Sequence, residues 1–189
     1  MRTRIILSTV VVGFLALLPV HGQSSQGHLN VIAGAGGGWF SVGGDDFGDI
    51  DDGLGFGGYL GVHLTGPLNL LAGVHYSSHE ATPAYDLTVL GLYLEPRFLF
   101  DQGERLVGWF IGGRLAWVQR EVYTFSSAGY ALGGILGMVI GTGWPVRIEP
   151  AITATALSFS PYSGSGDRAT GSSISLQIGI SIPLSRSAK

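Results

Sequence analysis

The sequence predicts an all-β protein, an eight-stranded antiparallel up-and-down transmembrane β-barrel. Three observations predict this fold class. Apolar residues alternate with small or polar residues in eight segments, most of them 10 to 13 residues long. A tilted strand needs roughly 9 to 11 residues to cross a bilayer, so these segments have the required length. Charged residues within the segments and away from the turns lie on the face opposite the large apolar residues, and the connections between segments alternate between short and long.

The composition limits the possible functions. Of 189 residues, 46% are hydrophobic and only 12% are charged, and there are 32 glycines and no cysteine. Disulfide scaffolds and cysteine-ligated metal centres are therefore excluded. The net charge is −3 with no cluster of lysine or arginine, so we expect no nucleic-acid partner. The sequence also contains no phosphate-binding loop, zinc-spaced histidine pair or dinucleotide fingerprint, so we expect no cofactor.

The N-terminus has the features of a cleavable signal peptide over residues 1–22. Arg2 and Arg4 precede an apolar run over residues 10–20, and Val20, His21 and Gly22 come directly before the expected cleavage point. The alternative is an uncleaved membrane anchor, but the run is shorter than the roughly 20 residues that a spanning helix needs. We therefore expect residues 23–189 to form the β-barrel domain, exported across the inner membrane.

The alternation of period two defines the expected strands. In residues 54–64, for example, apolar residues and one glycine occupy the even positions, and Gly, Tyr and His occupy the odd positions. Such a strand has two different faces. The eight expected strands are residues 29–40, 54–64, 68–77, 87–99, 105–119, 130–141, 146–157 and 173–183.

The connections predict the orientation of the barrel. Short turns are expected at residues 66–67, 101–104 and 142–145, and longer loops at residues 41–53, 78–86, 120–129 and 158–172. Transmembrane barrels have short periplasmic turns and longer outer loops. Both ends of the chain should therefore lie in the periplasm, and the longer loops should face outward.

Charge placement predicts a polar lumen. Five charged residues within the strands lie on the face opposite the large apolar side chains; they are Glu95, Arg97, Arg114, Arg147 and Glu149. Fourteen strand glycines share this charged face and four lie on the other, which suits the narrow interior of an eight-stranded barrel. We expect the five residues to form one network that plugs the lumen, with Arg114 paired most directly to Glu95.

Aromatic residues near the strand ends support a membrane location. At the loop ends of the strands, the outward face carries Trp39, Tyr76, Trp117 and Tyr130, as in an interfacial aromatic girdle. Beside the short turns lie Phe100 and Trp144.

A glycine repeat offers an alternative to one strand. Glycines at 129, 133, 137 and 141 also fit a dimerising transmembrane helix. A period of four satisfies a period of two as well, so the strand interpretation is preferred.

Residues 91–98, GLYLEPRF, and residues 147–150, RIEP, resemble the inward-charged strands of the outer-membrane β-barrel domain family. Nearly all of residues 23–184 is similar to the small eight-stranded barrels of this family, such as the membrane domain of outer-membrane protein A. The resemblance implies an integral protein of the bacterial outer membrane, in contact with membrane lipid and lipopolysaccharide. Pro96 and Pro150 remove ladder hydrogen bonds, so we expect a bulge or bend at each.

Two weaker candidate sites remain. His75 and Ser77 share a strand face and faintly resemble the motif of outer-membrane lipid A deacylases, although their parity places them in the lumen. Residues 41–53 contain five aspartates, and the expected default is a solvated acidic loop, with weak cation bridging to lipopolysaccharide as the alternative.

These features together predict a non-enzymatic barrel with a plugged lumen and a structural or surface-interaction role, in which any surface partner binds through residues 41–53 and 158–172. The alternatives are a narrow channel and a lipid A-modifying hydrolase that uses His75 and Ser77.

Overall fold

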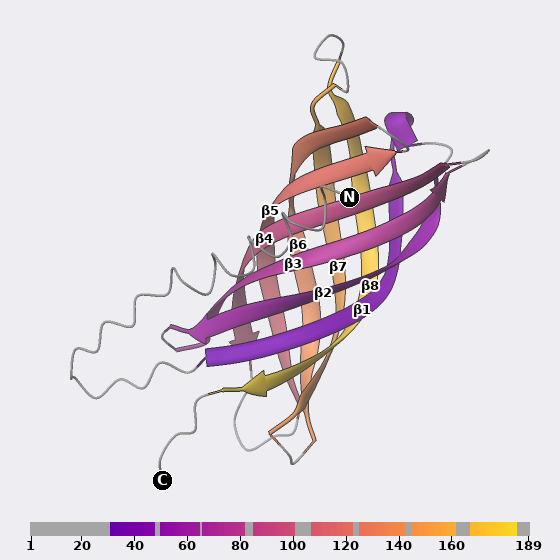
Figure 1. Ribbon diagram of the computed structural model, residues 1–189. Helices are drawn as coiled ribbons and strands as arrows, with labels where there is room; N and C mark the ends of the chain where they lie inside the picture. The colour runs from indigo at the N-terminus through magenta and orange to yellow at the C-terminus, as the bar shows by residue number, and fades with distance from the viewer. Residues whose placement is uncertain are drawn as a thin grey trace.

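The computed structural model describes residues 31–47, 50–64, 66–81, 85–100, 107–122, 125–142, 145–161 and 167–184, and within them the chain forms one closed antiparallel barrel (Figure 1). The strands are β1 (Val31–Gly43), β2 (Ile50–His63), β3 (Leu68–Ala81), β4 (Tyr85–Phe100), β5 (Val107–Val122), β6 (Phe125–Gly141), β7 (Arg147–Phe159) and β8 (Ala169–Pro183). The expected signal peptide, residues 1–22, lies outside the described residues.

The barrel is closed by the first and last strands. Figure 1 shows β1 beside β8, and their pairing runs continuously from Ile32 opposite Pro183 to Gly43 opposite Ser172. Closure satisfies the backbone of both edge strands, which a lipid environment requires because it offers no water to a free edge. The predicted fold class is therefore confirmed. The helical alternative for the glycine repeat is wrong, because this repeat lies within β6.

The inner and outer faces separate charge from hydrocarbon as predicted. Glu95 is fully buried in the interior, whereas its neighbour Leu94 is 47% exposed and Leu115 on β5 is 55% exposed on the outer surface. The outward aromatic residues Trp39, Trp117, Tyr130 and Phe100 are likewise exposed. Trp144 lies outside the described residues. Large apolar side chains are exposed on the outer face of the barrel, and such a surface indicates contact with lipid rather than with water. Within the described residues, no helix is long and apolar enough to cross a membrane.

The strands are longer than predicted, mainly at the end that carries the β1–β2, β3–β4, β5–β6 and β7–β8 connections, which we call the outer end. Residues 82–84 and 123–124 are all that separates the strands of two of these connections, so the expected long loops at 78–86 and 120–129 are wrong. The outward residues here are polar but continue the alternation, as at Glu80, Asp86, Ser126 and Thr170. At the outer end, the paired strands therefore extend beyond the apolar surface.

The two prolines do not produce the expected bulges. On β4 and β5, Leu94 pairs with Leu115 and Arg97 with Gly112, so the register is the same on both sides of Pro96. The pairing of β6 with β7 is likewise interrupted beside Pro150 without a change of register. Each proline removes a bond to one neighbouring strand, and the intact ladder on its other side keeps the strand in place. The register shift lies instead on β2, between Ile50 and Gly53.

Candidate functional site

Four charged side chains meet inside the barrel. Glu95 and Arg97 come from β4, Arg114 from β5 and Glu149 from β7, and all four are buried. Residues on one strand that differ by two positions share a face, which directs both Glu95 and Arg97 into the lumen. Glycines at positions such as Gly112 and Gly133 face the same interior and leave room for the long side chains, since a Cβ at either would collide with a neighbouring strand or side chain.

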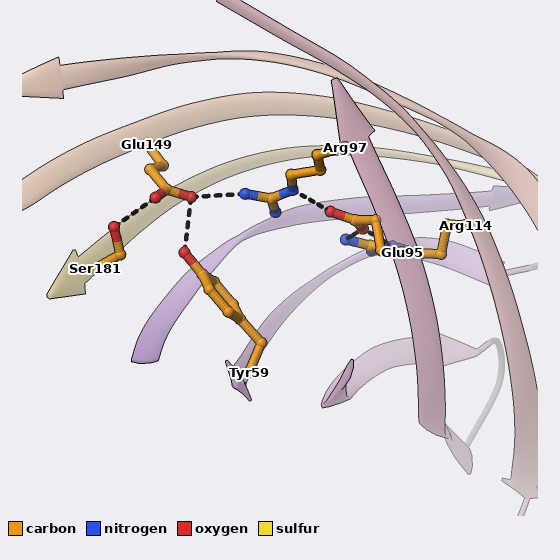
Figure 2. Close-up of polar contacts among 6 residues, drawn as sticks. All are labelled: Tyr59, Glu95, Arg97, Arg114, Glu149 and Ser181. Atoms are coloured by element: carbon orange, nitrogen blue, oxygen red, sulfur yellow. Dashed lines mark hydrogen bonds and ion pairs between the residues drawn. The ribbon is translucent and has the colours of Figure 1, made fainter. Parts of the chain in front are cut away.

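The four residues form a continuous chain of ion pairs across the lumen (Figure 2). Arg114 donates to Glu95 Oε2 from Nε at 2.6 Å and from Nη2 at 2.5 Å. Arg97 donates from Nε to the other oxygen of Glu95 and from Nη1 to Glu149 Oε2 at 2.7 Å. Two cations and two anions cancel, so the chain of ion pairs is neutral overall. Each charge has a partner, as burial in a membrane protein requires.

Two neutral residues complete the hydrogen bonding of Glu149; the sequence pattern placed Tyr59 in the interior, but neither residue was predicted to belong to the charged network. The Tyr59 hydroxyl on β2 donates to Glu149 Oε2 at 2.7 Å, and the Ser181 hydroxyl on β8 donates to Oε1. Their inward parity was a usable signal, but their partner is on β7, and for Tyr59 the connection spans 90 residues. We call the six residues Tyr59, Glu95, Arg97, Arg114, Glu149 and Ser181 the plug.

Aromatic rings hold the two guanidinium groups of the plug in place. The Arg97 guanidinium lies 4.3 Å from the centre of the Phe110 ring and 5.3 Å from that of Tyr59. The Arg114 guanidinium lies 4.3 Å from the centre of the Tyr93 ring. Such cation–π contacts strengthen when the cation is removed from water. The rings also fill the space around the ion pairs, which leaves a crowded cross-section.

Arg147 does not join the plug as expected. It is half-buried at the start of β7 and lines the inner part of the lumen with Arg97 and Glu149, but within the described residues no ion pair connects it to a carboxylate. Both oxygens of Glu149 are already engaged by Arg97, Tyr59 and Ser181. The expected network of five charges is therefore a network of four in which Arg147 has no place.

The outer mouth of the barrel is closed by a second, mainly apolar layer. After β1, the 3-10 turn η1 (Asp45–Phe47) inserts Phe47 into the mouth, where its side chain is 3% exposed. The Phe47 ring lies 6.0 Å from that of Phe159, and the Arg120 guanidinium stacks over both rings, at 5.4 and 4.8 Å. A Cβ at Gly171 would collide with the Phe47 ring, so the opposite strand also leaves space for it. We call this turn the lid.

The lid changes one part of the expected solvated acidic loop: Asp46, Asp51 and Asp52 are exposed as expected, but the chain between β1 and β2 is a short turn rather than a long loop. The Asp45 side chain and Asp49 lie outside the described residues. Gly44 has a φ of +129°, which favours glycine and turns the chain inward after β1. Asp46 then accepts a hydrogen bond from the Thr170 backbone at 2.8 Å, and this anchors the turn to β8. Asp51 and Asp52 belong to β2 rather than to a loop. Within the described residues, no group of three or more His, Asp or Glu side chains is placed to hold a metal ion.

The candidate pair His75 and Ser77 is not brought together as expected. Ser77 is hydrogen-bonded to His79, with 3.0 Å between Ser77 Oγ and His79 Nε2, while Nδ1 of His79 lies 3.3 Å from the Asp51 carbonyl oxygen. His75 instead packs between the rings of Phe40 and Tyr93. Sequence reasoning missed His79, although it shares the inward parity of Ser77. The Ser77–His79 pair is buried between the lid and the plug, away from the lipid surface.

Comparison with known proteins gives similarity of fold. No family model matches the sequence, and no curated protein matches it. The structure is similar to the crystal structure of Neisserial surface protein A (NspA), with a TM-score of 0.64 and 15% identity over 84% of this chain and 99% of that one. The chain has the fold of the small outer-membrane β-barrels. A major outer membrane protein from Thermus thermophilus is similar at a TM-score of 0.50 and 10% identity, over 84% of this chain and 100% of that chain.

The fold and the exposed apolar surface agree with the expected location in the bacterial outer membrane. At identities of 15% and 10%, these proteins are similar to the chain in fold.

Proposed function

We propose that this protein is a non-conducting, non-enzymatic barrel of the outer membrane with a structural or surface-interaction role. The observation that carries the proposal is the double closure of the lumen, by the plug in the middle and by the lid at the outer mouth. An eight-stranded barrel has an interior just wide enough to be filled by side chains. In this chain those side chains are ion-paired or stacked, so opening a path through the lumen would break these contacts.

The same closures argue against the two alternatives. A channel needs a continuous water-filled path, and the two spaces lined by Arg114 are small cavities of about 40 Å³ each. A lipid hydrolase needs its nucleophile at the lipid surface, whereas Ser77 is 3% exposed and faces the interior. A polar interior contact explains the Ser77–His79 hydrogen bond without any reaction.

The outer rim supports a role in surface contact through negative charge. Asp46, Glu80 and Asp86 are exposed there, and Glu80 on β3 lies directly opposite Asp86 on β4. Like charges in such a cross-strand pair repel one another, so a cation or a cationic partner would relieve the repulsion. Contact with the phosphates of lipopolysaccharide through divalent cations fits this surface, as does a basic partner at the rim. Of the two segments first expected to bind partners, the first has residues 44–49 between β1 and β2, and the second has residues 160–168 between β7 and β8.

Two measurements test the proposal. In planar bilayers the purified protein should give no stable single-channel currents, and stable ion-selective channels would overturn the non-conducting assignment in favour of a narrow pore. Lipid A from cells that express the protein should have the same acyl-chain pattern, by mass spectrometry, as lipid A from cells that express Ser77→Ala. Loss of an acyl chain that depends on both Ser77 and His79 would overturn the non-enzymatic assignment.

A further inference from the structure

The space between the lid and the plug contains a small chamber with polar groups in its wall. His75, Ser77 and His79 from β3, Arg114 from β5, Thr153 from β7 and Ser175 from β8 line it, together with apolar residues such as Val89 and Leu157. Toward the outer end, Phe47 of the lid belongs to the same apolar cluster as the wall residues Val89 and Leu157, and toward the opposite end the chamber is bordered by Arg114, which is paired with Glu95. We call this space the outer chamber.

Two polar atoms in the wall of the outer chamber need a partner. Within the described residues, His75 Nδ1 and Thr153 Oγ1 are fully buried and accept or donate no hydrogen bond. Thr153 as a whole is only 3% exposed. A buried polar atom without a partner loses its hydration and gains nothing in return, so such atoms are nearly always paired with protein or with bound water. His75 and Thr153 are on β3 and β7, and both line the outer chamber.

We propose that the outer chamber is a binding site for a small cluster of water molecules that hydrogen-bond to His75 and Thr153. Its cavity volume of about 40 Å³ exceeds the roughly 10–15 Å³ that one water needs. A bound water also needs two to four polar partners. Ser175 supplies a further donor, because its Oγ accepts a hydrogen bond from Gln177 Nε2 at 2.7 Å and keeps its own proton for another acceptor.

Charge favours water over an ion in this chamber. Arg114 is the charged residue that lines it, and two nitrogens of its guanidinium are already held by Glu95. The plug as a whole is neutral, so neither a cation nor an anion would find an uncompensated charge. The volume also excludes a metabolite or a lipid chain. The inference does not depend on the proposed role, since a conducting barrel could hold the same water.

The experiment uses the full chain in lipid nanodiscs and NMR cross-relaxation between water and protein. We expect long-lived cross-peaks from water to the Thr153 methyl group and to the His75 ring, and none to the Leu87 methyl groups, which are 1% exposed but lie outside the chamber. In Thr153→Val the water cross-peak to His75 should be lost or strongly weakened. Thr88→Val, on the outer wall, is the matched control and should leave it unchanged.

Xenon and halide ions provide the outcomes that would overturn the proposal. Xenon enters dry apolar cavities, so xenon-induced shifts at Val89 and Leu157 in the wild-type protein, without water cross-peaks, would mean that the chamber is dry. Shifts of the His75 and Thr153 signals when bromide replaces a large organic anion would mean that the chamber binds a small anion. The wild-type spectra decide between these outcomes even if the Thr153 variant fails to fold.

Discussion

Arg97 links the two halves of the plug, because its guanidinium contacts Glu95 on its own strand and Glu149 on β7. Glu149 in turn accepts from Tyr59 and Ser181, so three strands besides β4 meet at this one cluster. A single residue therefore connects distant parts of the wall through groups that are costly to leave unpaired in a buried site.

Replacing Arg97 should destabilise the barrel far more than replacing Arg147. Arg97→Met removes a partner from each of two buried carboxylates, and breaking a buried ion pair typically costs about 3–5 kcal/mol. Arg147→Met is the matched control, because this half-buried arginine has no carboxylate partner among the described residues, and we expect a loss below about 1 kcal/mol. Urea unfolding in lipid vesicles measures both. Equal losses of unfolding free energy in the two variants would show that the ion pairs of Arg97 do not stabilise the barrel.

At the scale of the strand, β6 shows why the inner and outer faces use glycine differently. A Cβ at Gly133, on the inner face, would collide with the Ala154 carbonyl oxygen and the Thr155 side chain of β7. A Cβ at Gly134, on the outer face, would meet the Gly112 carbonyl oxygen at an ordinary contact distance of 3.6 Å. The two glycines are adjacent in sequence, but an added methyl group would collide with the backbone only at Gly133.

We therefore expect opposite tolerance at neighbouring positions. Gly133→Ala should cost about 1–3 kcal/mol of unfolding free energy, the usual range for overpacking. Gly134→Ala should be within about 0.5 kcal/mol of the wild type or slightly more stable, since alanine buries more apolar surface in lipid and restricts the unfolded chain. The same urea titration distinguishes them. A stable Gly133→Ala barrel would mean that β6 and β7 can separate locally at this point.

In the barrel interior, buried side chains form two layers, the plug and the apolar cluster at the outer mouth, and Phe47 of the lid belongs to the outer one. The alternation of inward and outward residues along the strands explains the plug, but the lid comes from an irregular turn that folds back over the mouth. The lid covers the outer chamber, so its removal should expose residues that the wild type protects.

Cysteine accessibility tests the seal. Ser77→Cys should react with a membrane-impermeant thiol reagent roughly tenfold or more faster in a Phe47→Ala background than in the wild-type background, because local opening no longer has to precede the reaction. Ser126→Cys, exposed on the outer wall, is the control and should react at the same rate in both backgrounds. Equal rates for the Ser77→Cys pair would show that Phe47 does not seal the mouth.

Much of the fold was predictable because a bilayer imposes one rule on every strand. Leu94 must face lipid, so Glu95 must face the lumen, and the same reasoning places Arg97, Arg114 and Glu149 inside. The pairing of Arg114 with Glu95 follows from adjacent strands joined by one turn, and it is present in the structure. Such predictions depend on the alternation of inward and outward residues along a strand and on which segments follow one another, and both can be read from the sequence.

The sequence by itself determined which residues face inward and that the sheet must close. Tertiary structure decided which inward residues meet: Glu149 contacts Tyr59 and Ser181 rather than Arg147, and Ser77 contacts His79 rather than His75. The Glu149 contacts depend on how far each strand is shifted along its neighbours around the closed barrel, which parity does not specify. Ser77 and His79 lie on the same strand, β3, and there His75 packs between Phe40 and Tyr93 while His79 contacts Ser77. The lid was also decided in three dimensions, because Phe47 is buried by Phe159 and β8, which lie far from it along the chain.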